Sequence, residues 1–196
     1  GVSGILEPVK SRFVSIVELK ADMDSWCQWA IRQNGRISPM LIAFIRLRPD
    51  RLSAFVPSAD MTNSPTPRTW YNLSRIESLK LPNALEHEAM SGAVGEGDAT
   101  EYLAFRKLCT SMVSIDAILA DPQNAAMPKT PSEGYAICTG LAARANDKTI
   151  NRIGQYATRL AHADKGEYAA LLVRDAIRRT PKLANTADYV TLMCGP

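Results

Sequence analysis

Signals that start and stop helices divide most of this chain into short amphipathic segments. Asp22 is suited to cap a helix that runs to about Asn34, and Ser38-Pro39 opens a second helix, which Pro49 ends. One segment, residues 14–19, alternates apolar and polar side chains in the manner of a short half-buried strand. The sequence therefore predicts an all-α, or mainly α, fold with one short N-terminal strand.

Apolar side chains recur at helical spacing along these segments and predict the core. Residues 40–45 are apolar on most sides of their helix, which is expected of a central core helix. Aromatic residues at helical spacing belong to a core far more often than to a cofactor or base-stacking site. The side chains that we expect to be buried on this basis include Trp26, Trp29, Phe44, Tyr102, Leu103, Phe105, Leu108 and Met112.

Length and composition fit a folded body without a membrane span. The 196 residues are 46% hydrophobic and 22% charged, which is enough for one domain of good size or two small ones. No run approaches the roughly 18 apolar residues of a membrane span, and the N-terminus lacks the layout of a signal peptide. We therefore expect a cytoplasmic protein with no membrane partner.

Three features that could suggest a metal or cofactor site have simpler explanations. The four cysteines, Cys27, Cys109, Cys138 and Cys194, are far apart and have no histidine at metal-ligand spacing, so they predict reduced thiols. Glu86-His87-Glu88 cannot converge on one ion from a helix, and predicts a solvated helix face. The glycines of residues 92–97 follow a helix rather than a strand, and predict an interhelical turn after which a helix restarts at Asp98 or Thr100.

Thr66-Pro67-Arg68 carries the sharpest functional signal. Thr66 is a candidate N-cap, Pro67 has the preset φ of a first helical position, and Arg68 lies just inside the helix. A helix N-terminus attracts anions through its free N–H groups and its dipole, so a fixed guanidinium beside it would suit a phosphate sensor. The simpler alternative is an ordinary helix start with a solvated arginine.

A second arginine, Arg12, precedes the strand-like segment. Ser11-Arg12-Phe13, a tryptophan-containing helix and then Thr66-Pro67-Arg68 follow one another in the order found in the second half of an AAA+ ATPase of the MoxR type, which the chain resembles over residues 5 to about 110. Residues 26–30, 42–46 and 92–97 resemble more narrowly a phage or prophage branch of these ATPases.

This resemblance implies roles for both arginines. Arg12 would reach the nucleotide of the neighbouring subunit as an arginine finger. Arg68, on the small helical lid, would act as sensor 2, with Thr66 and Pro67 shaping the nucleotide-facing helix start. The parent protein would then be an ATP-dependent remodelling ATPase that forms a ring, expected to be a hexamer, and acts on a client protein that the sequence does not identify.

The elements that hydrolysis requires are missing from this sequence. It has no Gly-x-x-x-x-Gly-Lys-Ser/Thr loop and no strand that ends in an acidic pair to hold magnesium. The sequence also begins at Gly1 without an initiator methionine. We therefore expect a truncated ATPase whose AAA+ core lies upstream. ATP and Mg²⁺ would belong to the full-length parent, and the fragment alone would hold neither tightly and would hydrolyse no ATP.

Proline-rich residues 120–132 suggest a soft boundary. With the resemblance, the predicted organisation is the end of an AAA+ core segment over 1–21, a helical lid over 22–120 and a C-terminal helical extension over 121–196. No motif assigns a role to the extension.

A basic excess in the extension supports an alternative of another class. From Leu141 to Lys182 there are nine Lys or Arg residues against four Asp or Glu. The chain could therefore be a helical binding module for an acidic protein or for nucleic acid, although without aromatic interleaving or a continuous basic run we expect no tight nucleic-acid contact. A purely oligomeric scaffold is a third possibility. The basic residues concerned are Lys148, Arg152, Arg159, Arg174, Arg178 and Arg179.

Overall fold

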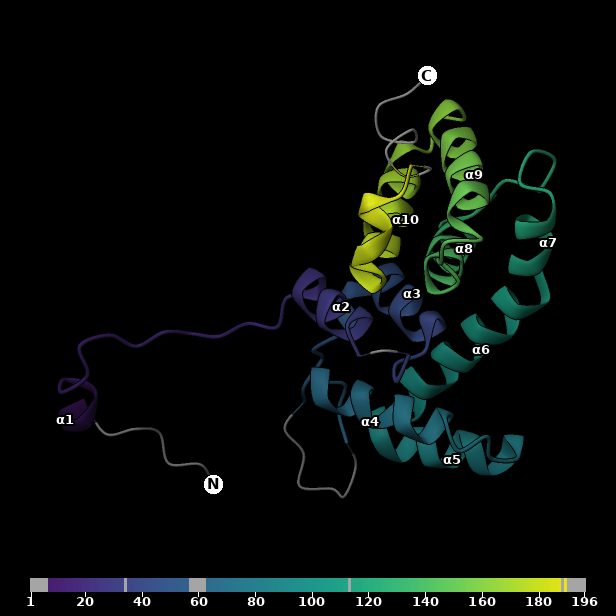
Figure 1. Cartoon of the computed structure of the whole chain (residues 1–196). Helices are drawn as coiled ribbons and strands as arrows, with labels where there is room; N and C mark the ends of the chain where they lie inside the picture. Colours follow the sequence, from purple (N-terminus) through teal and green to yellow (C-terminus); the bar gives the residue numbers. More distant parts are fainter. Residues whose placement is uncertain (1–6, 34, 57–62, 113, 188, 190–196) are drawn as a thin grey trace.

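The computed structural model describes residues 7–33, 35–56, 63–112, 114–187 and 189, and within them every regular element is a helix (Figure 1). The expectation of an all-α fold is confirmed. In chain order the elements are α1 (Glu7–Lys10), α2 (Met23–Ile31), α3 (Pro39–Leu47), the 3-10 helix η1 (Pro49–Arg51), α4 (Pro67–Glu77), α5 (Asn83–Val94), α6 (Glu96–Met112), α7 (Ile115–Ala120), α8 (Pro131–Ala143), α9 (Ile150–His162), α10 (Gly166–Arg179) and the 3-10 helix η2 (Pro181–Asn185).

Local capping explains where α2 and α3 begin. Asp22 accepts a hydrogen bond from the Ser25 N–H at 2.7 Å, and Ser38 accepts one at 3.2 Å from the N–H two residues further on. Each bond satisfies a backbone donor that the first helical turn leaves free. Both predicted helix starts are confirmed. α2 ends at Ile31, and the predicted end at Asn34 lies outside the described residues.

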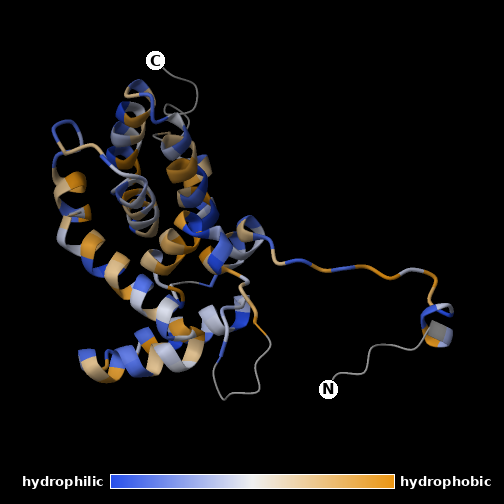
Figure 2. Ribbon diagram, turned by 180° about the vertical axis from the view of Figure 1, so that it is seen from behind, coloured by the Kyte–Doolittle hydropathy of each residue, from blue (hydrophilic) through white to orange (hydrophobic). Residues whose placement is uncertain are grey.

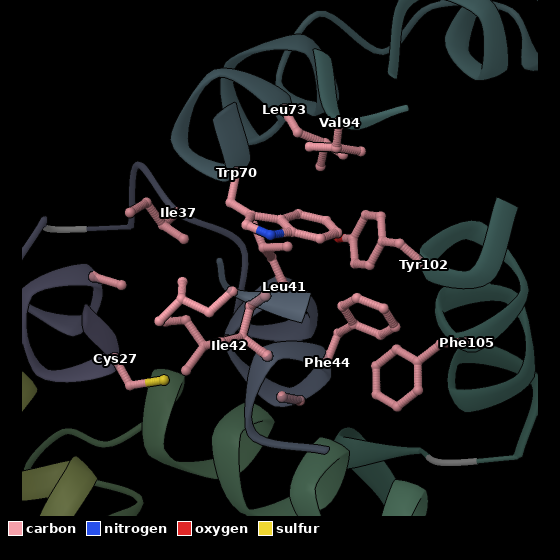
Figure 3. Close-up of a cluster of buried hydrophobic side chains, with 14 of the residues drawn as sticks. Cys27, Ile37, Leu41, Ile42, Phe44, Trp70, Leu73, Val94, Tyr102 and Phe105 are labelled. Atoms are coloured by element: carbon pink, nitrogen blue, oxygen red, sulfur yellow. The ribbon is translucent and has the colours of Figure 1, made fainter. Parts of the chain in front are cut away.

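α3 forms the centre of the first half of the fold, as its apolar sequence predicts. All residues from 41 to 46 are buried. The Phe44 ring lies 5.5 Å from the rings of both Trp70 and Tyr102, and 5.6 Å from that of Phe105, measured between centroids (Figure 3). Since Trp70 belongs to α4 and the other two rings to α6, these tilted and edge-to-face contacts fix both helices against α3.

α8 covers another side of α3 and joins it to the C-terminal helices. It packs against α3, α6, α7 and α10, and α9 packs against α10. A second buried cluster, which includes Cys138, Tyr156 and Leu172, lies among α7 to α10. The two clusters do not divide at residue 120, since Ile118 belongs to the second cluster and Ala136 to the first, and α3 and α8 make an extensive contact.

The short N-terminal strand is not present in the part of the chain that the structure describes. Residues 14–19 instead belong to an extended arm that projects from the helical body (Figure 1), and the apolar side chains of Val14, Ile16, Val17 and Leu19 are exposed. Figure 2 shows apolar and polar residues alternating along this arm. A strand needs a neighbour to pair its N–H and C=O groups, and the described helices offer no sheet edge.

Three side chains that we expected in the core are largely exposed. Trp29 is 41% exposed, Leu108 50% and Met112 57%. On α2 the buried positions are 26, 27, 30 and 31, and on α6 they are 99, 102, 105 and 109. The apolar residues thus extend beyond the stripe that each helix buries. Hydrophobicity at helical spacing therefore overestimated the width of the buried stripe.

The region around Glu86 and the following glycines also differs from expectation. Glu86 is only 7% exposed, because it forms an ion pair with Arg106 of α6. The expected interhelical turn is confined to Gly95, whose φ of +91° suits glycine. The next helix, α6, begins at Glu96, before the predicted start at Asp98 or Thr100.

Candidate functional site

Thr66 and Pro67 form the start of α4 as predicted. Thr66 Oγ1 accepts a hydrogen bond from the Thr69 N–H at 3.2 Å, and Thr69 Oγ1 accepts one from the Thr66 N–H at 2.8 Å. This reciprocal arrangement is a capping box, and Pro67 occupies the first helical position. The N-cap role of Thr66 is therefore confirmed.

Arg68 is exposed at this helix start. Neither its guanidinium nor its N–H forms a hydrogen bond with another described residue. Because Pro67 has no N–H and the Thr69 N–H bonds to Thr66, the first turn offers one free backbone donor, that of Arg68 itself. The helix start can therefore present a guanidinium, one N–H and the positive end of the helix dipole to an anion.

Two tryptophans hold this helix start in place. The Trp26 indole of α2 donates a hydrogen bond to the Pro67 carbonyl at 3.2 Å, and the Trp70 indole donates one to the Arg51 carbonyl at 2.8 Å. Trp70 is fully buried in the aromatic cluster (Figure 3), two residues after Arg68. The backbone at Arg68 is thus fixed from two sides, whereas its side chain stays in solvent.

Arg12 lies elsewhere, at the beginning of the extended arm. Its backbone N–H bonds to the Val9 carbonyl at 3.1 Å in the turn after α1, and its side chain is exposed. Figure 1 shows α1, which ends two residues before Arg12, at the far end of an arm that projects away from the body containing α4. The structure therefore does not bring the two predicted site arginines together within one chain.

The sequence interpretation missed a buried ion pair between α3 and α10. Arg46 donates to the Asp175 carboxylate from Nη1 at 2.6 Å and from Nη2 at 3.1 Å, and Thr139 Oγ1 of α8 lies 3.5 Å from Nη1. The two side chains are 5% and 1% exposed. Arg46 sits within an apolar helix and Asp175 in a polar one, so no local pattern connects them.

Two thiols lie near this pair and are held protonated. Burial raises the pKa of Cys27 and of Cys138 to about 12, with a further upward contribution from the Asp175 charge. Both thiols are free, as predicted, and so is Cys109, whereas Cys194 lies outside the described residues. A thiol with a raised pKa is a poor nucleophile at neutral pH, so these cysteines serve the core rather than catalysis.

A second charged network joins α5 and α6 to the C-terminal end of α4, the helix that carries Arg68. Arg106 donates to Glu77 at 3.2 Å and to Glu86 at 2.9 Å, and the Tyr102 hydroxyl donates to Glu77 at 2.8 Å. Burial, together with the Glu77 charge, raises the pKa of Tyr102 well above its ordinary value. The network fixes the C-terminal end of α4, so the whole helix that carries Arg68 is held at both ends.

Some basic side chains of the extension, which would contribute to the alternative binding surface, form hydrogen bonds inside the fold. Arg152 donates to the Leu119 carbonyl at 2.9 Å, and Arg159 donates to the Ala125 carbonyl at 3.0 Å. These bonds attach α9 to α7 and to the loop that follows α7. Two of the six basic residues are thereby committed to structure, which argues against a continuous phosphate-binding surface.

Other site types find no support in the described part of the chain. No group of three or more His, Cys, Asp or Glu side chains there could hold a metal ion. Among the same residues, no helix combines the length and the apolar character needed to cross a membrane.

Comparison with known proteins gives no relative. No protein-family model matches the chain, and no curated protein or solved structure is significantly similar to it.

Proposed function

We propose that this chain is the helical lid and C-terminal extension of a MoxR-like AAA+ ATPase of the phage or prophage type. In this proposal its function is to complete ATP sites in a ring-shaped, homohexameric remodelling enzyme whose nucleotide-binding core is encoded upstream. ATP and Mg²⁺ bind to the complete protein. The chain alone does not hydrolyse ATP, because its sequence lacks the phosphate loop and the magnesium ligands.

The observation that carries the proposal is the geometry of Arg68. Its backbone is fixed by a capping box and two indole hydrogen bonds, whereas its guanidinium is exposed and bonds to no other described residue. An ordinary solvated arginine would also be exposed, so the support for the proposal lies in the fixed backbone beside the helix N-terminus. A fixed backbone with an exposed guanidinium suits an arginine that binds the phosphates of a nucleotide.

The extended arm gives independent support. Its strand-like alternation and exposed apolar side chains suit pairing with a sheet, which the described helices do not provide. An upstream AAA+ core would supply a sheet for residues 14–19, and Arg12 would then lie at the edge of that core. Since an arginine finger acts on the nucleotide of a neighbouring subunit, separation of Arg12 from Arg68 within one chain is what the ring requires.

In the complete ATPase the two arginines have complementary tasks. Arg68 contacts the γ-phosphate bound by its own subunit and couples it to the position of the lid. Arg12 stabilises the charge that develops during phosphoryl transfer in the adjacent subunit. We also propose a cytoplasmic location, since the buried cysteines of the described chain are free thiols, as is usual in a reducing compartment.

The decisive experiment uses the full-length protein that contains this chain. Its reading frame should encode a phosphate loop and an acidic magnesium motif upstream of Gly1. Arg68→Ala and Arg12→Ala should each lower ATP turnover by about 10³-fold or more. Arg75→Ala, on the same helix, and Lys20→Ala, on the same arm, are matched controls that should retain activity. An upstream frame without these motifs, or full activity of Arg68→Ala, would contradict the proposal.

A mixing experiment separates the two roles. Rings that combine Arg12→Ala subunits with subunits inactivated in the phosphate loop contain some interfaces with an intact finger and an intact pocket. Such mixed rings should regain part of the activity, whereas the same mixture made with Arg68→Ala should not. Failure of rescue in rings shown to be mixed would refute the action of Arg12 in trans.

A further inference from the structure

Side chains of α9 and α10 line a groove. The two helices lie side by side at the C-terminal end of the body (Figure 1). The groove has a volume of about 590 Å³, and short side chains such as Ala157 and Ala161 of α9 and Ala170 of α10 leave it open. Val173 and Ile177 of α10 add larger apolar surface to its lining. The predicted AAA+ roles do not use this apolar surface.

The charged side chains that line the groove are all positive. Arg174 and Arg178, one helical turn apart on α10, contribute to its lining, and none of its described lining residues is acidic. Arg174 is exposed and forms no hydrogen bond or ion pair with a described residue, while Arg178 lies 3.9 Å from the buried Asp175. Asp24 and Glu167 border only a smaller pocket, of about 190 Å³, which shares Arg174.

We propose that this groove binds an acidic amphipathic helix of a partner protein, a function beyond that of an ATPase lid. A helix of about 14 residues spans roughly 20 Å, which matches α9 and α10, of 13 and 14 residues. Leucine-like side chains at i, i+3, i+4 and i+7 enter the apolar floor. Carboxylates on the flank of the bound helix meet Arg174 and Arg178.

Nucleic acid fits this surface less well than an acidic helix does. The arginines of α9, Arg152 and Arg159, bond to backbone carbonyls of α7 and of the loop that follows it. What remains at the groove is a pair of arginines beside an apolar floor. Phosphate binding uses a track of basic side chains, whereas an apolar floor with charge beside it is the complement of an amphipathic helix.

The test uses the whole chain and two fluorescein-labelled peptides of about 16 residues that form amphipathic helices with the same leucine stripe. One peptide carries glutamate and the other lysine at the remaining positions. By fluorescence anisotropy, the acidic peptide should bind about tenfold more tightly than the basic one, which corresponds to about 1.4 kcal/mol. Its affinity should fall between about 50 and 300 mM salt, because the ion pairs are screened.

Substitutions assign the binding to the groove. Ala161→Trp and Ala170→Trp, each at an exposed position, should fill it and weaken acidic-peptide binding about tenfold or more, with the helical circular dichroism unchanged. Arg174→Glu combined with Arg178→Glu should reverse the preference between the two peptides. The control pair, Arg36→Glu with Lys107→Glu, makes the same charge change at exposed positions outside the groove and should preserve it.

Several outcomes would overturn the proposal. They are equal binding of the two peptides, no detectable binding, or acidic-peptide binding that the tryptophan substitutions leave intact in folded protein. Binding that appears only after removal of residues 190–196 would identify the chain's own end as the occupant. Dimerisation in sedimentation that Ala161→Trp abolishes would identify a second copy, and would equally refute a partner helix. None of these results depends on ATP turnover, so they leave the proposed ATPase role unaffected.

Discussion

Arg46 and Asp175, 129 positions apart in the chain, share two hydrogen bonds of 2.6 and 3.1 Å at the junction of the two halves of the fold. Arg46 projects from the apolar helix α3 and Asp175 from α10, and both side chains are almost fully buried. Although burial opposes its charge, the hydrogen bonds and the charge of Asp175 raise the pKa of Arg46. The pair therefore ties the predicted lid to the predicted extension with a charged contact inside a largely apolar contact surface.

Removing one partner of this ion pair should destabilise the protein severely. Asp175→Asn leaves the Arg46 charge buried without a counter-ion, and should lower the free energy of unfolding by about 3–5 kcal/mol. Arg46→Met should cost a similar amount. The double variant Arg46→Met with Asp175→Leu should recover much of the loss, because hydrophobic residues of similar volume often replace a buried pair without cost. Urea unfolding of all four proteins measures the coupling, and simple additivity of the two losses would contradict this account.

The capping box should contribute to stability through Thr66. Thr66→Ala removes the acceptor for the Thr69 N–H and should lower the free energy of unfolding by about 1 kcal/mol. Thr66→Ser keeps the acceptor and should retain most of this stability. Thermal unfolding followed by circular dichroism compares the two variants. A loss of the same size in both would mean that the hydroxyl oxygen is not the stabilising group.

Two helical glycines should respond oppositely to alanine. A Cβ at Gly134 of α8 would lie 2.6 Å from Cζ of Tyr168, whereas one at Gly92 of α5 would meet nothing within 4 Å. Gly92→Ala should therefore stabilise the protein by up to about 1 kcal/mol through helix propensity. Gly134→Ala should destabilise it by about 1–2 kcal/mol, since Tyr168, whose ring also contacts Tyr135, must move. Chemical denaturation gives both values, and stabilisation by Gly134→Ala would show that the ring moves freely.

Helix starts were predictable because their causes are local. Asp22, Ser38 and Thr66 each bond to a backbone N–H within three residues, so the short-range sequence contains the whole interaction. For the same reason, the sequence predicted Pro67 and Arg68 as the first residues of a helix. The predicted roles of Arg12 and Arg68 in ATP hydrolysis remain predictions, since they depend on a nucleotide and a core outside this sequence.

Long-range partners were not predictable in this way. The local sequence predicts that Glu86 is solvated. Its partner in the fold, Arg106, lies 20 positions later in the chain. Residues 14–19 have the alternation of a strand, but pairing depends on a neighbouring edge that alternation cannot supply. Trp29 follows the helical spacing of the core, yet the limited width of the contact between α2 and its neighbours leaves it 41% exposed. In each case the outcome depends on whether a part of the chain distant in sequence packs against the residue.

The buried thiols predict a loss of stability at alkaline pH. In the folded protein the pKa of Cys27 and that of Cys138 are raised from 9.0 to about 12. The folded state therefore keeps protons that the unfolded chain releases as the pH rises. By linkage, the contribution of each thiol to stability is complete below about pH 8 and is progressively lost between about pH 9 and 12, by at most about 1.4 kcal/mol per pH unit.

Urea unfolding between about pH 8 and 10 tests this linkage, because the range lies mostly below the titration of tyrosine and lysine. The wild-type free energy of unfolding should fall steeply over this range. A Cys27→Ala and Cys138→Ala double variant should start from a lower value at pH 8, since two buried sulfur atoms are lost, but should fall less steeply. Cys109→Ala provides the comparison, because the pKa of that thiol is also raised, to about 11, and removal of one such thiol should flatten the dependence on pH less than removal of two. Parallel pH profiles of the double variant and the wild type would show that the two thiols titrate alike in the folded and unfolded states, contrary to the protonated, buried thiols described beside Arg46 and Asp175.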